Sequence, residues 1–124
     1  MFEDSGVFCE IEVRRSGAMT VAVLRGELDL SAAHQVGPVL VRLVDGPGTD
    51  LVLDLRQVSF LDCGGIGMLC RVRNQALARQ GRLRLVVDSP FLLRTLRVLG
   101  LEGPLGVMPG LDRDPARASA EASG

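Results

Sequence analysis

The residues best suited to chemistry lie in one short segment, Asp62-Cys63-Gly64-Gly65-Ile66-Gly67. It places a carboxylate and a thiol beside three glycines after an apolar stretch, an arrangement that invites comparison with phosphate-binding loops. Such a loop needs a lysine, and all fourteen Lys and Arg positions of this chain hold arginine. The dinucleotide pattern Gly-x-Gly-x-x-Gly also fails, because counting from Gly65 puts Cys70 in place of the third glycine. Asp62 would repel an anion there, so the sequence argues against nucleotide binding.

The remaining reactive side chains form no catalytic pattern. The three cysteines Cys9, Cys63 and Cys70 make no Cys-x-x-Cys pair, and the single histidine, His34, is expected on a helix surface. Without paired carboxylates, a metal-ligand cluster or a Ser/His/Asp arrangement, we predict no enzyme, no metal and no cofactor. Two interpretations of Cys63 stay open: a redox-sensitive thiol at a helix N-terminus, or simply a small residue.

Composition narrows the function classes further. The chain has 124 residues, 47% hydrophobic and 3% aromatic, with a net charge of −1. This suits one domain with an aliphatic core. With so few aromatic residues and no net positive charge, the chain lacks the stacking platform and the basic surface that nucleic-acid binding needs. The acidic start, the odd number of cysteines and the lack of a long apolar run predict a cytoplasmic protein that does not span a membrane.

Hydrophobic periodicity and turn residues predict the elements that position the glycine-rich segment. An edge strand at 8–13 and a buried strand at 19–25 form a hairpin. A helix follows, capped by Asp29 or Ser31 and interrupted at Gly37-Pro38. A central strand at 51–55 leads into the segment above and then into a helix over 65–80 that ends at Gly81. A strand at 83–87, a helix beginning after Ser89 and a short strand near 105–108 complete the order. This order predicts an α/β fold with a mixed, mostly parallel sheet of 4–5 strands and about 3–4 helices. Residues 1–7 and 112–124 are expected to be disordered.

Two motifs carry a resemblance to a known family. Asp62-x-x-Gly65-Ile66-Gly67, after a strand that contains Asp54-Leu55, resembles the signature of STAS domains. The earlier Gly26-Glu27-Leu28-Asp29 resembles a second STAS signature. The resemblance places a STAS domain at 8–110 and implies an anti-sigma factor antagonist that works by partner switching.

The resemblance also implies a partner and a switch. The partner would be an anti-sigma factor of the GHKL serine-kinase type. This kinase phosphorylates a serine of the antagonist's loop, and the phosphorylated antagonist no longer binds it. That position corresponds to Gly64 here, which has no hydroxyl, so we predict constitutive binding or control by other means. Ser59 is expected in a buried strand and is discounted as a substitute site.

The predicted contact surface joins two loops and the first turns of the helix that begins near residue 65. Its members are Asp29, Leu30, Ser31, Asp62, Cys63, Gly64, Gly65, Ile66 and Met68. Asp29 and Asp62 stay open between partner contact and helix capping, and Met68 is interpreted as an exposed anchor for a partner. A small-ligand sensor or a scaffold in a stress-signalling complex is the alternative function, and a homodimer is a further expectation.

Overall fold

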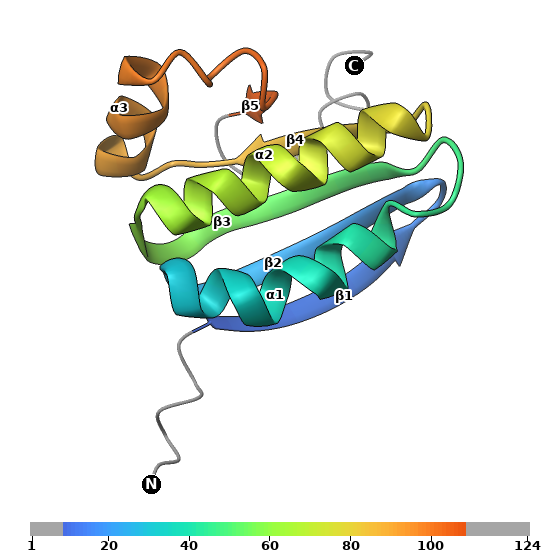
Figure 1. Ribbon diagram of the computed structural model, residues 1–124, viewed down its shortest axis with the longest axis horizontal. Helices are drawn as coiled ribbons and strands as arrows, with labels where there is room; N and C mark the ends of the chain where they lie inside the picture. The colour runs from blue at the N-terminus through green and yellow to red at the C-terminus, as the bar shows by residue number, and fades with distance from the viewer. Residues whose placement is uncertain (1–8, 109–124) are drawn as a thin grey trace, which may run out of the picture.

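The computed structural model describes residues 9–108 of the chain (Figure 1). The predicted disordered ends, 1–7 and 112–124, and the limits of the predicted domain 8–110 lie outside these residues. The elements, in chain order, are β1 (Cys9–Ser16), β2 (Met19–Leu28), α1 (Leu30–Leu43), β3 (Asp50–Leu61), α2 (Cys63–Ala78), β4 (Arg82–Val86), α3 (Pro90–Val98) and β5 (Val107–Met108).

The strands form one sheet whose spatial order follows the chain, β1-β2-β3-β4-β5. β1 runs antiparallel to β2, and all later neighbours are parallel. Right-handed crossovers that always step in the same direction place their helices on the same face of the sheet. α1 and α2 accordingly lie side by side on one face (Figure 1). The predicted mostly parallel α/β fold is confirmed, with five strands and three helices in the described chain.

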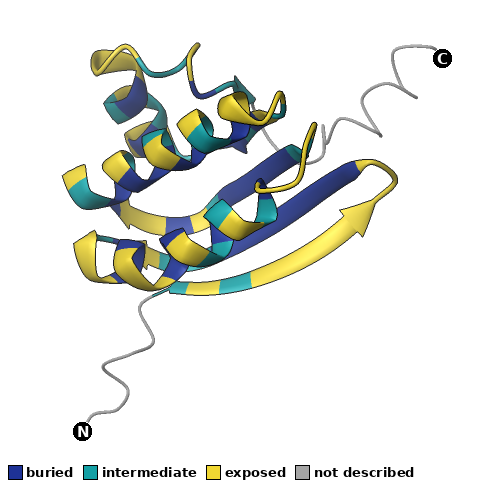
Figure 2. Cartoon of the chain, turned by 45° about the vertical axis from the view of Figure 1, so that its right-hand side comes forward, coloured by how far each residue is buried: buried dark blue, intermediate teal, exposed yellow. Residues whose placement is uncertain are grey.

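The main core lies between the sheet and the helices. Alternate leucines of β3, namely Leu51, Leu53 and Leu55, are fully buried and belong to one cluster with Leu40 of α1 and Leu69 of α2. Figure 2 shows the buried inner sides of the helices and their exposed outer sides. The continuous apolar run in the central strand therefore reflects burial on both faces of the sheet.

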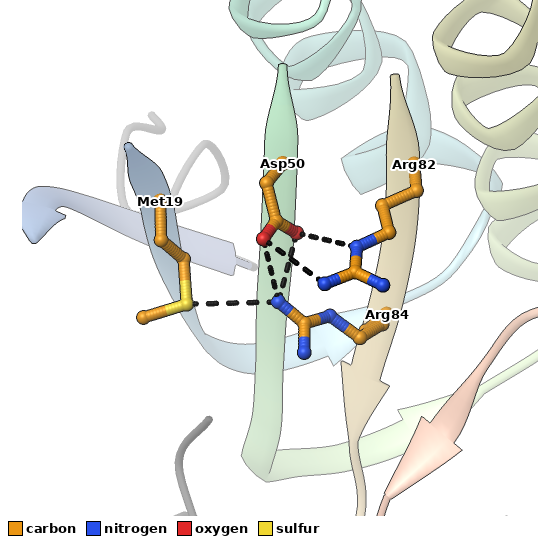
Figure 3. A network of polar contacts seen from close by, with 4 residues as sticks. All are labelled: Met19, Asp50, Arg82 and Arg84. Carbon is orange, nitrogen blue, oxygen red and sulfur yellow. Dashed lines mark hydrogen bonds and ion pairs between the residues drawn. The ribbon is translucent and has the colours of Figure 1, made fainter. Parts of the chain in front are cut away.

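The opposite face of the sheet carries a second, smaller apolar cluster. It consists of Met19, Val21, Val23, Val52 and Val86. Next to it, Asp50 at the start of β3 accepts hydrogen bonds from two arginines of β4 (Figure 3). The shortest joins Arg84 Nη2 to Asp50 Oδ2 at 2.7 Å. This network ties together the amino-terminal ends of two parallel strands, at the end of the sheet away from the glycine-rich segment.

β2 and β3 are longer than predicted. Their parallel pairing continues past two register shifts until Leu28 lies opposite Leu61, so the strands end at 28 and 61 and not at 25 and 55. The prediction that Ser59 is buried is wrong, because Ser59 is exposed. The pairing with β2 steps from Val58 to Phe60 and passes over Ser59, so this last part of β3 is irregular and buries only Val58 and Leu61.

α1 continues through Pro38, against the predicted interruption. Proline cannot donate the N–H bond to the carbonyl of His34, which weakens a helix interior. The helix persists because Val36, Gly37 and Leu40 are buried against the rest of the fold. Packing of the buried face therefore outweighs the missing hydrogen bond.

α2 begins at Cys63, two residues earlier than predicted, and ends without a glycine in the left-handed position. That position is taken by Gln80, with φ of 60°. The next residue, Gly81, donates its N–H to the Ala76 carbonyl at 2.7 Å, which closes a Schellman motif. Gly81 is needed for a different reason: a Cβ there would lie 2.4 Å from the Thr49 carbonyl oxygen.

Candidate functional site

Asp29 caps α1. Its backbone is extended, and its Oδ1 accepts a hydrogen bond from the N–H of Ala32 at 2.9 Å. This is the N-cap geometry that satisfies an otherwise free donor of the first turn. Ser31, the alternative cap, lies inside the helix with an exposed side chain. Leu30, the first helical residue, is 57% exposed and is one of seven exposed large apolar residues of the described range.

Asp62 caps α2 in the same manner. Its Oδ1 accepts the N–H of Gly65 at 3.0 Å, and its backbone is extended. The capping interpretation is therefore confirmed for both aspartates, while contact with a partner stays a prediction for each. Cys63 follows as the first helical residue and is an exposed free thiol.

The two helix starts lie beside each other because β2 and β3 are neighbours that end together. Leu28 pairs with Leu61, and the N–H of Asp62 donates to the Leu28 carbonyl at 3.4 Å. Figure 1 shows α1 and α2 beginning at the same end of the sheet. We call Asp29–Ser31 together with Asp62–Ile66 the paired helix starts.

Two glycines allow this close approach. A Cβ on Gly65 would lie 2.2 Å from the Leu28 carbonyl oxygen. A Cβ on Gly64 would lie 2.6 Å from Cα of Leu30 and 2.7 Å from its Cβ. Both distances are far below any normal carbon contact, so the spacing of the two helices requires glycine at these positions. Gly64 thus has no room for a side chain as the chain is folded.

Most of the predicted site residues are brought together, and two are not accessible. Met68 is fully buried, so its prediction as an exposed partner contact is wrong. It lies on the inner side of α2, where a Cβ on Gly37 would meet Met68 Cγ at 3.1 Å. Gly65 is buried as well, under the end of β2. The accessible members are Asp29, Leu30, Ser31, Asp62, Cys63, Gly64 and Ile66.

The sequence prediction missed a groove between α2 and α3, which we call the α2–α3 groove. It encloses about 410 Å³ and is lined by Leu61, Asp62, Cys63, Ile66, Arg94, Thr95, Val98 and Leu99. Val98 is 77% exposed and Leu99 52% exposed. The core contacts of α3 come from Leu92 and Leu96, so Leu99 lies outside its buried face. Two adjacent apolar residues at the end of an amphipathic helix, outside its buried face, are the signal that could have found this groove.

A smaller hollow lies on the other side of Gly64, between α1 and α2, and we call it the α1–α2 hollow. It encloses about 130 Å³, and its lining residues are Leu30, Ala33, His34, Pro38, Gly64 and Arg71. His34 is exposed there, which confirms its predicted place on a helix surface. The two hollows flank the first turn of α2.

Between residues 9 and 108, no three His, Cys, Asp or Glu side chains gather in a way that could hold a metal ion. The cysteines of that range are free, and burial raises the pKa of the Cys9 thiol above its ordinary value. Cys63 is the exposed thiol among the three cysteines, whereas Cys9 and Cys70 are partly buried. Within the described residues, no helix is long and apolar enough to cross a bilayer.

Comparisons with known proteins agree with this geometry. A family model described as "Mlab, STAS domain" matches residues 11–109. An anti-sigma factor antagonist from Mycobacterium paratuberculosis is 24% identical, with a TM-score of 0.75 over 90% of this chain and 92% of that one. The anti-sigma factor antagonist SpoIIAA in its unphosphorylated form is 24% identical, with a TM-score of 0.71 over 93% of this chain and 97% of that one. The phosphorylated form of SpoIIAA from Bacillus is 23% identical, with a TM-score of 0.67 over 91% of this chain and 99% of that one. At these identities the likeness to the solved structures concerns the fold.

Proposed function

The chain belongs to the STAS domain family, and from this premise we propose that it is an anti-sigma factor antagonist. It would bind an anti-sigma factor of the GHKL kinase type, release a sigma factor and so regulate transcription in a bacterial cytoplasm. Its activity would be docking and not catalysis. The fold resembles that of anti-sigma factor antagonists, SpoIIAA among them, which supports this choice.

The observation that carries the proposal is the surface formed by the paired helix starts. Leu30 is 57% exposed and Cys63 is exposed, and both stand next to capped helix N-termini. The α2–α3 groove continues this surface with Val98 and Leu99. Protein interfaces have an apolar, well-packed centre inside a polar rim, and this surface offers exposed apolar side chains for such a centre.

We further propose that docking is not switched by phosphate at position 64. The family resemblance places the phosphorylated serine at Gly64, which has no hydroxyl. The backbone of Leu30 fills the space that a serine Cβ would need. A phosphate of about −1.5 to −2 charges beside Asp62 would repel a docking protein, and this chain offers no such group at that position.

The first experiment measures binding of the purified chain to the kinase-type anti-sigma factors of its host by calorimetry. We expect one of them to bind, and Leu30→Ala to weaken that binding by about tenfold or more. Leu77→Ala is the matched control, because Leu77 is 49% exposed on α2 and belongs to neither hollow. If no anti-sigma factor binds, the proposed function is wrong. If one binds and Leu30→Ala binds it as tightly as Leu77→Ala, the proposed contact surface is wrong.

The second experiment incubates the complex with ATP and measures phosphate on the chain by mass spectrometry. We expect none on Cys63–Gly65 and an unchanged affinity after incubation. Stoichiometric phosphate together with release of the partner would contradict constitutive docking.

The α2–α3 groove supports a second candidate function, small-ligand sensing. Its volume of about 410 Å³ falls in the range of small-molecule sites, which is roughly 300–1,000 Å³. A ligand of the folded state raises the melting temperature by mass action. A shift that is lost on Val98→Glu would favour this function over docking.

A homodimer stays a prediction from the sequence. The exposed edge strand β1 carries Glu10, Glu12, Arg14 and Arg15, and such charges disfavour pairing of edge with edge. A dimer would therefore have to use another surface.

A further inference from the structure

The α1–α2 hollow is lined by two basic side chains. Arg71 and His34 both line it, and no carboxylate is among its six lining residues. Neither side chain makes an ion pair or a side-chain hydrogen bond with any other residue of the described range 9–108. Arg79, two turns further along α2, does find a partner, since its Nη2 lies 3.1 Å from Asp45 Oδ1. Within residues 9–108, the N–H donors of the Arg71 guanidinium group thus have no side-chain partner, and the group lines a hollow.

The surface of α2 leaves a clear approach to Arg71. Residues three and four apart share a helix face, so Gly64, Gly67 and Arg71 follow one another along the side of α2. A Cβ added at Gly67 would meet nothing within 4 Å. Neither Gly64 nor Gly67 therefore places a side chain between the helix start and the guanidinium group.

The size of the hollow decides what can enter it. Cofactor and drug-sized ligands occupy roughly 300–1,000 Å³, well above the 130 Å³ available here. A water molecule takes up about 30 Å³ of liquid volume, so the hollow holds one small polar group and a little water. An arginine guanidinium binds a carboxylate through two parallel N–H donors, and a histidine ring adds a further donor.

We propose that the α1–α2 hollow receives an aspartate or glutamate side chain of the docking protein, held by Arg71 and His34. The proposal rests on the proposed function, because the hollow borders Gly64 and Leu30 of the paired helix starts. It assigns the docking protein a defined chemistry: an acidic residue placed to enter beside α1 while apolar residues meet Leu30 and the α2–α3 groove.

The first test needs no partner and uses acetate as the probe. Acetate is titrated into ¹⁵N-labelled protein, with chloride at equal ionic strength as the control. We expect acetate-specific shifts of the Gly64 and Gly67 amides and of the Arg71 Nε–H, and we expect the amide shifts to be absent in Arg71→Gln. Absence of such shifts, or equal amide shifts in Arg71→Gln, would overturn the assignment of a carboxylate site.

The second test uses the anti-sigma factor that binds the wild-type chain. Arg71→Gln should weaken binding about tenfold or more, as expected for loss of a hydrogen bond to a charged group. Arg42→Gln, the loss of an exposed arginine of α1 outside the hollow, should leave the affinity within about twofold of wild type. A partner variant with the acidic residue changed to lysine should lose binding to the wild-type chain and regain it with Arg71→Glu.

The two proposals fail in different ways. If no anti-sigma factor binds the wild-type chain, the proposed function is wrong, and the acetate titration alone decides whether the hollow is a carboxylate site. If an anti-sigma factor binds and Arg71→Gln binds it as tightly as wild type, docking stands and the acidic contact is overturned.

Discussion

At the scale of single residues, three neighbouring glycines of α2 do different things. Gly64 and Gly65 lie against the backbone of Leu30 and Leu28, whereas Gly67 faces open space. Only the first two are required by the approach of α1 and β2 to the start of α2. Gly67 makes no such close approach possible and lowers helix stability, because glycine in a helix interior is less favourable than alanine.

This difference predicts opposite effects of the same substitution. Gly64→Ala should destabilise the protein by about 1–3 kcal/mol, because its Cβ forces the backbone of α1 away. Gly67→Ala should stabilise it by about 0.5–1 kcal/mol through helix propensity alone. Urea denaturation of both variants measures the two free energies of unfolding. A stable Gly64→Ala protein would show that the helix starts separate easily, and then a serine at 64 could also be accommodated.

Some of these residue roles could be read from the sequence and others could not. Capping was one of the two interpretations of Asp29 and Asp62 that the sequence offered, because a cap is a local feature, set by an acid just before a helix. The buried place of Met68 and the contact of Gly64 with Leu30 depend on how closely two helices approach. No local pattern encodes that distance, which is why the prediction of Met68 as an exposed partner contact was wrong.

At the scale of elements, the helix ends show how local rules give way to packing. α3 ends in a Schellman motif with Gly100 in the left-handed position, where φ is 72°. α2 ends in the same motif, but Gln80 holds that position with φ of 60°. The sequence predicted the stop of α2 at Gly81 because glycine is the usual residue there. The structure instead uses Gly81 for the close approach to Thr49.

The two motifs predict a matched pair of changes in stability. Gln80→Gly should stabilise the protein by up to about 1 kcal/mol, because a left-handed conformation is unfavourable for a residue with a Cβ. Gly100→Ala should destabilise it by about 1 kcal/mol for the same reason. A Cβ at position 100 would meet nothing within 4 Å, so the left-handed backbone is the whole cause of this loss. Thermal unfolding of the two variants against wild type gives both signs. Equal signs would mean that contacts of the Gln80 side chain, and not its backbone, determine the stability of this turn.

At the scale of the whole molecule, the order of elements was the strongest prediction. Alternation of strands and helices after an initial hairpin implied a mostly parallel sheet, and the structure has one. The lengths of β2 and β3 were underestimated because their last residues gain order from pairing with each other and not from their own apolar pattern. That extension is what brings the two helix starts together, so the site depends on a feature that the strand pattern alone does not reveal.

Both faces of the sheet are buried, but the helices of residues 9–108 cover only one of them. α1 and α2 lie on one face, yet Val52 and Val86 on the opposite face are fully buried. The sheet is therefore stabilised from two sides, with a large cluster under the helices and a small one behind them. A two-sided sheet holds the paired helix starts on a stiff base, which suits a surface that docks without rearrangement.

A comparison of one valine from each cluster tests this two-sided view. Val52→Ala removes apolar volume from the small cluster, and Val72→Ala removes the same volume from α2 in the large cluster; both side chains are fully buried. Each buried methylene contributes about 0.8 kcal/mol, and the cavity left behind adds to the loss. We expect both variants to lose about 1.5–2.5 kcal/mol of unfolding free energy, measured by urea denaturation with unchanged slopes. A loss below about 0.5 kcal/mol for Val52→Ala, with a full loss for Val72→Ala, would show that the sheet depends on its helical face alone.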